Sequence, residues 1–381
     1  MPLLSRSTIV SLALAALFLA TADAGAQPPA ASATEVPLRV AMAGLVHDHA
    51  LGFLEHFRQR GDLQIVGIAE ADHSLVAEYV KRFGLDPGLF HDDLEAMIEK
   101  VRPQAVLVYT NTRDHRQVVE IAARHGVAVM MEKPLAVSVD DARAIEKAAA
   151  AGRIPVLVNY ETTWYSSNKA AYDLVHQGAL GEIRKVVVHD GHRGPQEIGV
   201  SPTFLAWLTD PERNGGGALF DFGCYGADLM TWLMDGRRPD SVTAITQRIK
   251  PALYPRVDDE ATILLTYPKA QAILQASWNW PFGRKDMEVY GATGSVMTVE
   301  RGSVRVRLSE QDEKVVEAKA LPDHEADSVA YLRAVVLGGL KPEGLSSLET
   351  NITVTEILDA ARRSAAEGKT ISLGGGLPRH Q

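Results

Sequence analysis

Short apolar runs alternate with amphipathic segments along the first part of the chain. Each apolar run is rich in β-branched residues and predicts a strand: residues 38–43, 63–69, 105–109, 127–131 and 155–159. Apolar positions at helical spacing between them predict helices at residues 51–60, 74–83, 114–125 and 140–151. Such alternation is typical of βαβ units with right-handed crossovers. We therefore predict an α/β fold in which residues 37–159 form a doubly wound, parallel Rossmann domain.

The pattern changes after Asn159, where we place a domain boundary. Longer β-rich runs separated mainly by turns follow at residues 183–190, 241–249, 261–267, 272–278 and 287–290. They predict a C-terminal α+β domain, residues 160–381, with an open and mostly antiparallel sheet. Two predicted helices, residues 167–177 and 217–234, cover one side of it. An amphipathic helix at residues 347–368 is expected to pack back on the body.

The N-terminus has the pattern of a secretory signal peptide. Arg6 precedes an apolar run over residues 9–20, and small residues follow, with cleavage expected after Ala24 or Ala26. The run is too short for a membrane span of about 20 residues. We expect residues 1–26 to be removed, residues 27–36 to form a disordered leader, and the mature protein to be periplasmic or secreted.

Composition and charge narrow the possible partners. The 381 residues carry a net charge of -9 with no Lys/Arg cluster, which argues against nucleic acid and anionic membranes. Small neutral or polar substrates fit better. Cys224 is the only cysteine, so neither an intramolecular disulfide nor a thiolate metal cluster within the chain is possible.

The first strand-to-helix turn carries part of a dinucleotide-binding fingerprint. Gly44 takes the tight-turn position, but Val46 and His49 stand where two further glycines are usual. An ordinary strand-to-helix turn is the alternative for this loop. Glu70, at the end of the second strand, favours the cofactor interpretation because a carboxylate there binds both ribose hydroxyls. With no arginine beside it for a 2′-phosphate, Glu70 favours NAD over NADP.

Two His-containing pairs need separate consideration. His47 and His49 form an H-x-H, but a zinc site needs three or four converging ligands, so we predict no metal. We expect His47 to donate to a cofactor phosphate, in a loop that includes Leu45. Asp190 and His192 are better suited to substrate hydroxyls than to a metal.

Two further segments carry candidate chemistry. Pro134 ends the strand at residues 127–131 and sets Lys133 at its carboxyl end, where open α/β sheets bind ligands. After three glycines, a continuous helix would place Asp221, Tyr225 and Asp228 on one face. A carboxylate and a phenol beside a lysine suit proton transfer at a carbinol or carbonyl. A capped amphipathic helix with a buried tyrosine is the alternative.

These motifs together resemble the glucose-fructose oxidoreductase and inositol dehydrogenase (Gfo/Idh/MocA) family. The likeness rests on Thr110-Asn111 with His115, on Glu132-Lys133-Pro134, and on the stretch from Gly216 to Asp228. It implies hydride transfer between nicotinamide and a sugar or polyol, and a homo-oligomer, a dimer or tetramer, built through the second-domain sheet. The cofactor-binding residues it implies are Gly44, Leu45, Val46, His47, His49, Glu70, Thr110, Asn111, His115, Glu132 and Lys133. The substrate-binding residues are Asn159, Tyr160, Trp164, His192, Asp221 and Tyr225.

The resemblance implies that Lys133 and Tyr225 act with the acidic partner Asp221 in catalysis. Our hypothesis is that Tyr225 exchanges the hydroxyl proton while Lys133 stabilises the developing alkoxide. A phenol has an unperturbed pKa of about 10, so a nearby ammonium is expected to bring the pKa of Tyr225 into range. Four aromatic residues either stack on sugar faces or serve as core or interface aromatics: Trp164, Tyr165, Trp278 and Trp280.

Export raises alternatives to a simple dehydrogenase. Free NAD is scarce outside the cytoplasm, so an exported enzyme would have to retain and regenerate its cofactor. That would favour redox-neutral chemistry such as sugar–sugar oxidoreduction, epimerisation or glycoside cleavage. A non-catalytic carbohydrate-binding homologue is the third possibility.

Overall fold

The structure, a computed structural model, describes residues 36–374. From residue 37 onward, the described residues form one compact unit. The predicted signal peptide, and the predicted leader up to residue 35, lie outside the described residues. Among the residues that are described, none of the helices combines the length and the apolar character needed to cross a membrane.

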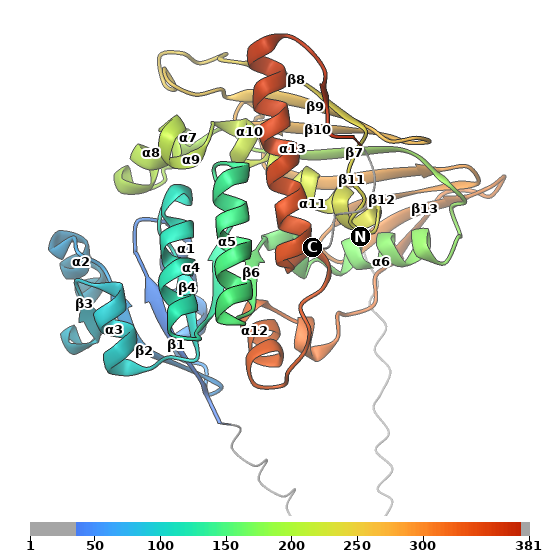
Figure 1. Cartoon of the computed structure of the whole chain (residues 1–381). Helices are drawn as coiled ribbons and strands as arrows, with labels where there is room; N and C mark the ends of the chain where they lie inside the picture. The colour runs from blue at the N-terminus through green and yellow to red at the C-terminus, as the bar shows by residue number, and fades with distance from the viewer. Residues whose placement is uncertain (1–35, 375–381) are drawn as a thin grey trace, which may run out of the picture. The chain divides into compact units, whose positions relative to one another are not determined.

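The first sheet is parallel, as predicted for a Rossmann domain, and contains six strands, of which five were predicted (Figure 1). They are β1 Leu38–Ala43, β2 Leu63–Ala69, β3 Phe90–His91, β4 Ala105–Val108, β5 Ala128–Glu132 and β6 Val156–Asn159. The strand order is β3-β2-β1-β4-β5-β6. After β1, the chain adds β2 and β3 on one side of β1 and then β4 to β6 on the other, so a topological switch point lies between β1 and β4. Doubly wound sheets bind ligands at the carboxyl ends of the strands beside such a switch point.

Helices cover both faces of this sheet. They are α1 His49–Phe57, α2 His73–Phe83, α3 Leu94–Val101, α4 His115–Arg124 and α5 Val139–Gly152. The carboxylate of Asp72 accepts the backbone N–H groups of Ser74 and Leu75 at the start of α2. Gly84 ends the same helix with a left-handed backbone (φ 62°), as the sequence predicted.

The second sheet is larger than predicted but has the expected character. It contains nine strands in the order β14-β13-β12-β11-β7-β10-β9-β8-β15, and only β7 and β10 pair in parallel. Its strands are β7 Ile183–Gly191, β8 Ser241–Gln247, β9 Glu260–Thr266, β10 Gln271–Ser277, β11 Arg284–Gly291, β12 Gly294–Glu300, β13 Ser303–Leu308, β14 Lys314–Glu317 and β15 Ile371–Ser372. The sequence prediction missed β12 to β15.

The helices that pack against the second sheet include α6 Ser166–His176, α11 Gly223–Leu233 and α13 Leu348–Glu367. Helix α13 also contacts α5 of the first layer, which confirms that the C-terminal helix packs back on the body (Figure 1). Exposed apolar side chains on the strands, including Ile245 and Leu264, lie on the uncovered face of the sheet.

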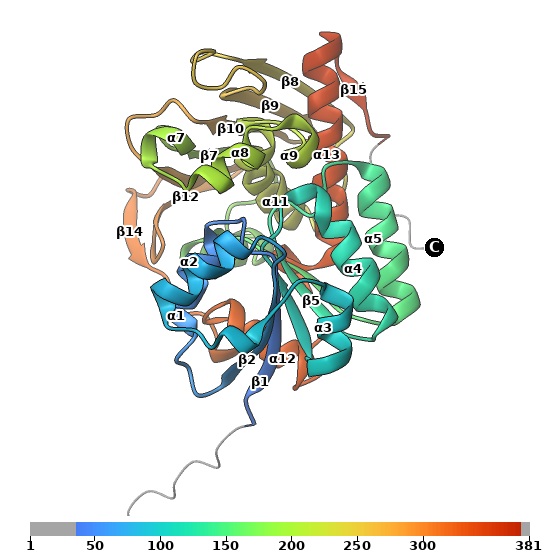
Figure 2. The same ribbon diagram turned by 90° about the vertical axis from the view of Figure 1, so that its left-hand side faces the viewer.

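The prediction missed several short helices that complete the site. They are α7 Pro195–Ile198, α8 Pro202–Leu208, α9 Pro211–Asn214 and α12 Ser328–Val336. Helices α7 to α9 follow one another in the green segment of Figure 2. The indole of Trp207 in α8 donates to the carbonyl of Val46 (3.0 Å), and the carboxylate of Asp48 accepts the N–H of Ser201 (2.8 Å). This segment therefore fixes the first turn of the Rossmann layer.

Candidate active site

A buried ion pair joins the two sheet layers. Lys133 directly follows β5, as predicted, and its Nζ lies 2.6 Å from Oδ1 of Asp221 and 3.1 Å from the carbonyl oxygen of Asp221. The two side chains are only 7% and 8% exposed. Burial alone would raise the pKa of Asp221, but the Lys133 ammonium outweighs it and holds that pKa below its usual value. The pair is therefore charged at neutral pH.

The helix that was predicted over residues 217–234 is interrupted, which corrects the sequence prediction. Helix α10, Ala218–Asp221, ends before Phe222, and α11 begins at Gly223. The N–H of Tyr225 donates to Phe222 rather than to Asp221 (3.1 Å), so the carbonyl of Asp221 is free to accept from Lys133. Asp221, Tyr225 and Asp228 consequently do not share one helical face.

Trp278 holds the second oxygen of the Asp221 carboxylate. Its indole N–H donates to Oδ2 at 2.9 Å, and its ring is completely buried. Of the two interpretations of this tryptophan, the structure supports the core residue and not the sugar platform. The carboxylate of Asp221 is thus fixed from both sides, which orients the ammonium of Lys133.

Tyr225 lies between two lysines. Its ring centroid is 5.2 Å from Nζ of Lys133 and 4.4 Å from Nζ of Lys285, and its hydroxyl accepts from Lys285 at 3.4 Å. Burial nevertheless raises the pKa of Tyr225 well above its ordinary value, and the neighbouring Cys224 and Glu161 add to the effect. The expectation that a nearby ammonium brings this pKa into the working range was wrong: the residue is a neutral phenol here.

Lys285 and Glu161 are site residues that the sequence prediction missed. Nζ of Lys285 lies 2.5 Å from Oε2 of Glu161, and this contact overcomes burial and lowers the pKa of Glu161 to about 2. Glu161 comes shortly after β6. Its place at the carboxyl end of a parallel strand could have identified it as a candidate site residue from the sequence. Lys285 had no such local signal, because its position depends on the pairing of β11 with β7.

Asp190 of β7 lies opposite Lys285 of β11 in the strand register, and its contact with substrate hydroxyls stays a prediction. The residue is 1% exposed, and neither carboxylate oxygen has a hydrogen-bond partner within residues 36–374. Burial raises the pKa of Asp190 well above its usual value. His192, two residues later, is half-buried, and its Nδ1 accepts the N–H of Gly194 (2.9 Å).

A chain of hydrogen bonds runs along the carboxyl ends of β5 and β6. The indole of Trp164 donates to Asn159 (3.0 Å), the amide of Asn159 donates to Oε1 of Glu132 (3.2 Å), and Oε2 of Glu132 lies 2.8 Å from Nδ1 of His49. The structure therefore brings four of the predicted site residues together beside Lys133. Tyr160, by contrast, is completely buried and its hydroxyl donates to Asn351 (3.0 Å).

A cavity of about 370 Å³ opens beside the switch point between β1 and β4. Gly44 lines it with a φ of +79°, and a Cβ there would lie 2.8 Å from Cγ2 of Thr110. Glu70 lines it as well, with its carboxylate accepting the N–H groups of Leu45 and Asp72 (both 2.9 Å). Glycine is required at residue 44 because no side chain fits this turn.

Of three other predicted cofactor residues, Asn111 lines this cavity, whereas His115 and His47 do not. The amide of Asn111 donates to Asp114 (2.7 Å). His115 is buried, with Nδ1 3.2 Å from the carbonyl of Leu135, and burial lowers its pKa to about 4. His47 is 2% exposed, and burial keeps its pKa well below the usual value, so it is neutral at pH 7.

Two clusters within residues 36–374 bring three possible metal ligands together: His47, His49 and Glu132, and His189, Asp286 and Glu288. In the first, Nδ1 of His47 accepts the backbone N–H of His49 (3.1 Å). In the second, Arg284 forms an ion pair with Asp286. The absence of a metal from the mechanism stays a prediction.

Comparison with known proteins identifies the chain. Residues 38–160 match the family model described as "Oxidoreductase family, NAD-binding Rossmann fold", and residues 168–297 match the GFO/IDH/MocA C-terminal domain. The two matches together cover more than half of the chain. The chain belongs to the GFO/IDH/MocA oxidoreductase family. This confirms the family predicted from Glu132-Lys133-Pro134 and the glycine-rich stretch.

Individual relatives of this GFO/IDH/MocA chain are distant. It is 25% identical over 209 residues to trans-1,2-dihydrobenzene-1,2-diol dehydrogenase of Bos taurus, covering 55% of this chain and only 58% of that protein. It is 25% identical over 340 residues to D-apiose dehydrogenase of Paraburkholderia graminis, covering 84% of this chain and 86% of that protein. The fold is similar to that of aldose-aldose oxidoreductase from Caulobacter crescentus, with a TM-score of 0.74, 22% identity, and coverage of 88% and 100%.

The residues at the cavity fit the NAD expected of a GFO/IDH/MocA Rossmann layer. The Gly44 turn leaves the backbone open, and each oxygen of Glu70 has a lone pair beyond its one backbone contact. The charged residues that line the cavity are all acidic: Glu70, Asp92, Asp93 and Asp114. Such a lining accepts ribose hydroxyls and opposes a 2′-phosphate, which favours NAD over NADP.

Proposed function

We propose that this protein transfers hydride between NAD and a carbinol carbon of a sugar or polyol. The observation that carries the proposal is the buried Lys133–Asp221 pair beside the ring of Tyr225, at the strand ends that adjoin the cofactor cavity. Membership of an oxidoreductase family supports it, as does the similarity to a D-apiose dehydrogenase. When bound, the nicotinamide supplies or accepts the hydride.

Lys133 is suited to hold the reacting oxygen. An ammonium has three N–H donors, and Lys133 uses two of them on Asp221, through the carboxylate and the carbonyl. The third is available to a substrate hydroxyl or carbonyl. Asp221 and Trp278 fix the lysine in place, so the positive charge is positioned before an alkoxide develops.

Tyr225 is suited to move the proton. Because its raised pKa keeps it protonated, it acts as the acid when a carbonyl is reduced: its O–H bond breaks and the proton passes to the substrate oxygen. The ammonium groups of Lys133 and Lys285 stabilise the transient phenolate. Lys285 then returns a proton to the phenolate and is itself reprotonated from solvent. Oxidation of a carbinol uses the same groups in reverse.

The test combines cofactor analysis with two variants. Purified protein is denatured, released nicotinamide is identified, and sugars and polyols are screened by cofactor absorbance. Lys133→Met and Tyr225→Phe should each lose turnover and retain NAD. Tyr290→Phe is the matched control, because its hydroxyl bonds Glu288 rather than any of the groups around Lys133. Full activity in either site variant would refute the assignment of roles.

A redox-neutral reaction with retained NAD is the second candidate. The signal-peptide pattern of residues 1–26 favours it, since we propose that the protein is exported to a compartment poor in free NAD. The similarity to a protein named aldose-aldose oxidoreductase agrees with this. Transfer of deuterium from one sugar to another without net NADH would support it, whereas freely exchanging NAD and net NADH would support a dehydrogenase.

We also propose that the chain forms a homo-oligomer through the uncovered face of the second sheet. Exposed Ile245 and Leu264 on that face would be buried by a second copy. Light scattering of the purified protein measures the assembly directly. A monomer at micromolar concentration would refute this proposal.

A further inference from the structure

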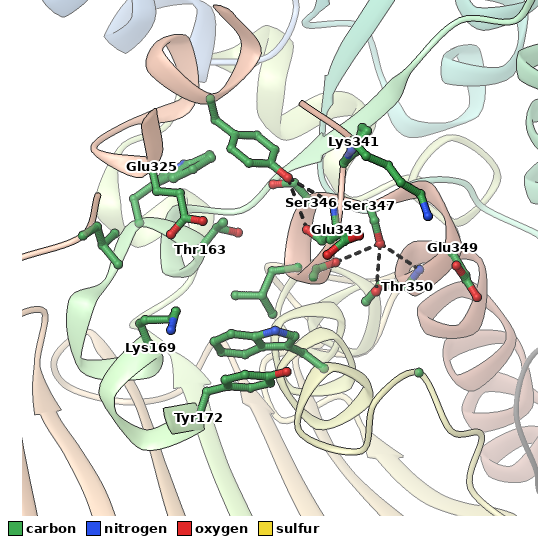
Figure 3. A pocket seen from close by; sticks show the side chains of 18 of the residues that line it. Thr163, Lys169, Tyr172, Glu325, Lys341, Glu343, Ser346, Ser347, Glu349 and Thr350 are labelled. Carbon is green, nitrogen blue, oxygen red and sulfur yellow. Dashed lines mark hydrogen bonds between the residues drawn. The ribbon is translucent and has the colours of Figure 1, made fainter. Parts of the chain in front are cut away.

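A second cavity lies on the side of α6 and the start of α13. It has a volume of about 480 Å³, which is in the range of small-molecule sites (Figure 3). Its walls come from segments far apart in the sequence: the residues before α6, the end of α11, and the connection between α12 and α13. None of its lining residues belongs to the groups assigned above to hydride or proton transfer.

Aromatic rings form much of this cavity. Trp232 stacks on Tyr172 with ring centroids 4.1 Å apart and an angle of 10°. Trp164 and Tyr331 form a second pair at 5.7 Å. Figure 3 shows Tyr172 of this stacked pair below Glu343 and Ser346, which belong to the connection that leads to α13.

Core packing does not account for these tryptophans. Trp207 and Trp278 are 3% and 0% exposed and fill the core. Trp164 and Trp232 are only half-buried, and both line this one cavity. Partly exposed aromatic rings that face a common hollow offer flat apolar surfaces to a ligand.

Polar groups with unused hydrogen-bonding capacity surround the rings. Within residues 36–374, the indole N–H of Trp232, the ammonium of Lys341 and the carboxylate of Glu343 form no hydrogen bond or ion pair. The buried hydroxyl of Ser346 also lacks a hydrogen-bond partner in the described part of the chain. One free cation and one free anion at the rim favour a neutral ligand with many hydroxyls over a ligand of either charge.

We propose that this cavity is a second saccharide-binding site, which holds one neutral pyranose unit apart from the site of hydride transfer. The sugar's C–H face would lie on the aromatic rings, and its hydroxyls would bond Lys341, Glu343 and the Trp232 indole. The proposal does not depend on the proposed redox reaction, because it requires only binding and rests mainly on Trp232, Lys341 and Glu343, none of which has a role in hydride or proton transfer.

The experiment measures binding of methyl pyranosides of glucose, galactose and xylose to the full chain by saturation-transfer NMR and titration calorimetry. The wild type should bind at least one of them, and Trp232→Leu should weaken that binding at least tenfold. Binding should persist in Tyr225→Phe, because that residue belongs to the other site. Trp280→Leu is the matched control, since Trp280 is also half-buried but does not line this cavity.

Substitutions of two exposed residues keep the test decisive if Trp232→Leu fails to fold. Lys341→Ala and Glu343→Gln should each weaken binding severalfold, whereas Lys314→Ala on β14 should not. Failure of all three probes to bind would overturn the proposal. So would binding that is lost in Tyr225→Phe but unchanged in Trp232→Leu, because the sugar would then occupy only the redox site.

Discussion

Nζ of Lys133 donates to Oδ1 of Asp221 at 2.6 Å, with both side chains almost completely excluded from water. Asp221→Ala would leave a buried ammonium without its counter-charge. Removing one partner of a buried pair costs about 3–5 kcal/mol. We expect a loss of that order in the free energy of unfolding, measured by urea denaturation at pH 7.

The control for this prediction is an exposed ion pair. Lys169 and Asp173 lie on α6 with side chains 40% and 42% exposed, so Asp173→Ala should cost at most about 1 kcal/mol. The effect of Asp221→Ala should also shrink at low pH. The pKa of Asp221 is lowered in the folded state, so its stabilisation is present above the unfolded value of about 3.9 and is lost as the pH falls through the folded value. Equal losses for the two variants would contradict the prediction.

The turn at Gly44 predicts a specific cofactor defect. Gly44→Ala would add a Cβ at a φ of +79°, 2.8 Å from Cγ2 of Thr110 and 3.1 Å from the carbonyl of Tyr109. We expect weaker NAD binding in calorimetry together with lower stability. Gly84→Ala is the matched control: its φ is +62°, but a Cβ there meets nothing within 4 Å. It should cost about 1–2 kcal/mol and leave NAD affinity unchanged. Normal NAD binding by Gly44→Ala would show that this turn is not part of the cofactor site.

The acidic lining of the cofactor cavity predicts a preference for NAD over NADP. Ala71 follows Glu70 and lines the same cavity. Ala71→Arg should lower the Kd for NADP at least tenfold, because a charge-assisted hydrogen bond to phosphate is worth about 1.5–3 kcal/mol. The same change at the exposed Ala326 should have no such effect. Tighter binding of NADP than of NAD by the wild type would show that Glu70 does not face the ribose.

Asp228 predicts an unusual pH dependence of stability. This residue of α11 is completely buried, neither carboxylate oxygen has a partner among residues 36–374, and burial raises its pKa well above the usual value. The folded state therefore keeps a proton that the unfolded state releases above about pH 4. The resulting stability loss grows as the pH rises, up to the folded pKa.

Asp228→Asn removes this ionisation with little change in size. Its stability relative to wild type should increase between pH 4 and pH 8 in urea denaturation. Asp140→Asn, at an exposed position of α5, should change within about 0.5 kcal/mol over the same interval. A relative stability of Asp228→Asn that is the same at both pH values would show that Asp228 has a partner in solution.

The sequence predicted the first layer well because each of its strands and helices is specified by residues that are close together in the chain. Each parallel strand is a continuous apolar run, and Gly84 ends its helix with a left-handed backbone that glycine adopts at no steric cost. Lys133 was placed correctly for the same reason. The buried apolar strand and the proline that follows it put Lys133 at the carboxyl end of the strand. Strand β3 was missed because a strand of two residues carries no usable periodicity, and helix α3 was missed as well.

The sequence by itself thus determined the fold class, the family and the position of Lys133 at a strand end. Only the tertiary structure decided what surrounds that lysine. Helix periodicity predicted Asp221 and Tyr225 on one continuous face, but the bond from Lys133 to the Asp221 carbonyl accompanies a break at Phe222. Lys285 reaches Tyr225 through strand register in a nine-stranded sheet, and burial sets the protonation of the phenol. Register and burial depend on residues distant in the chain, so no local pattern encodes them.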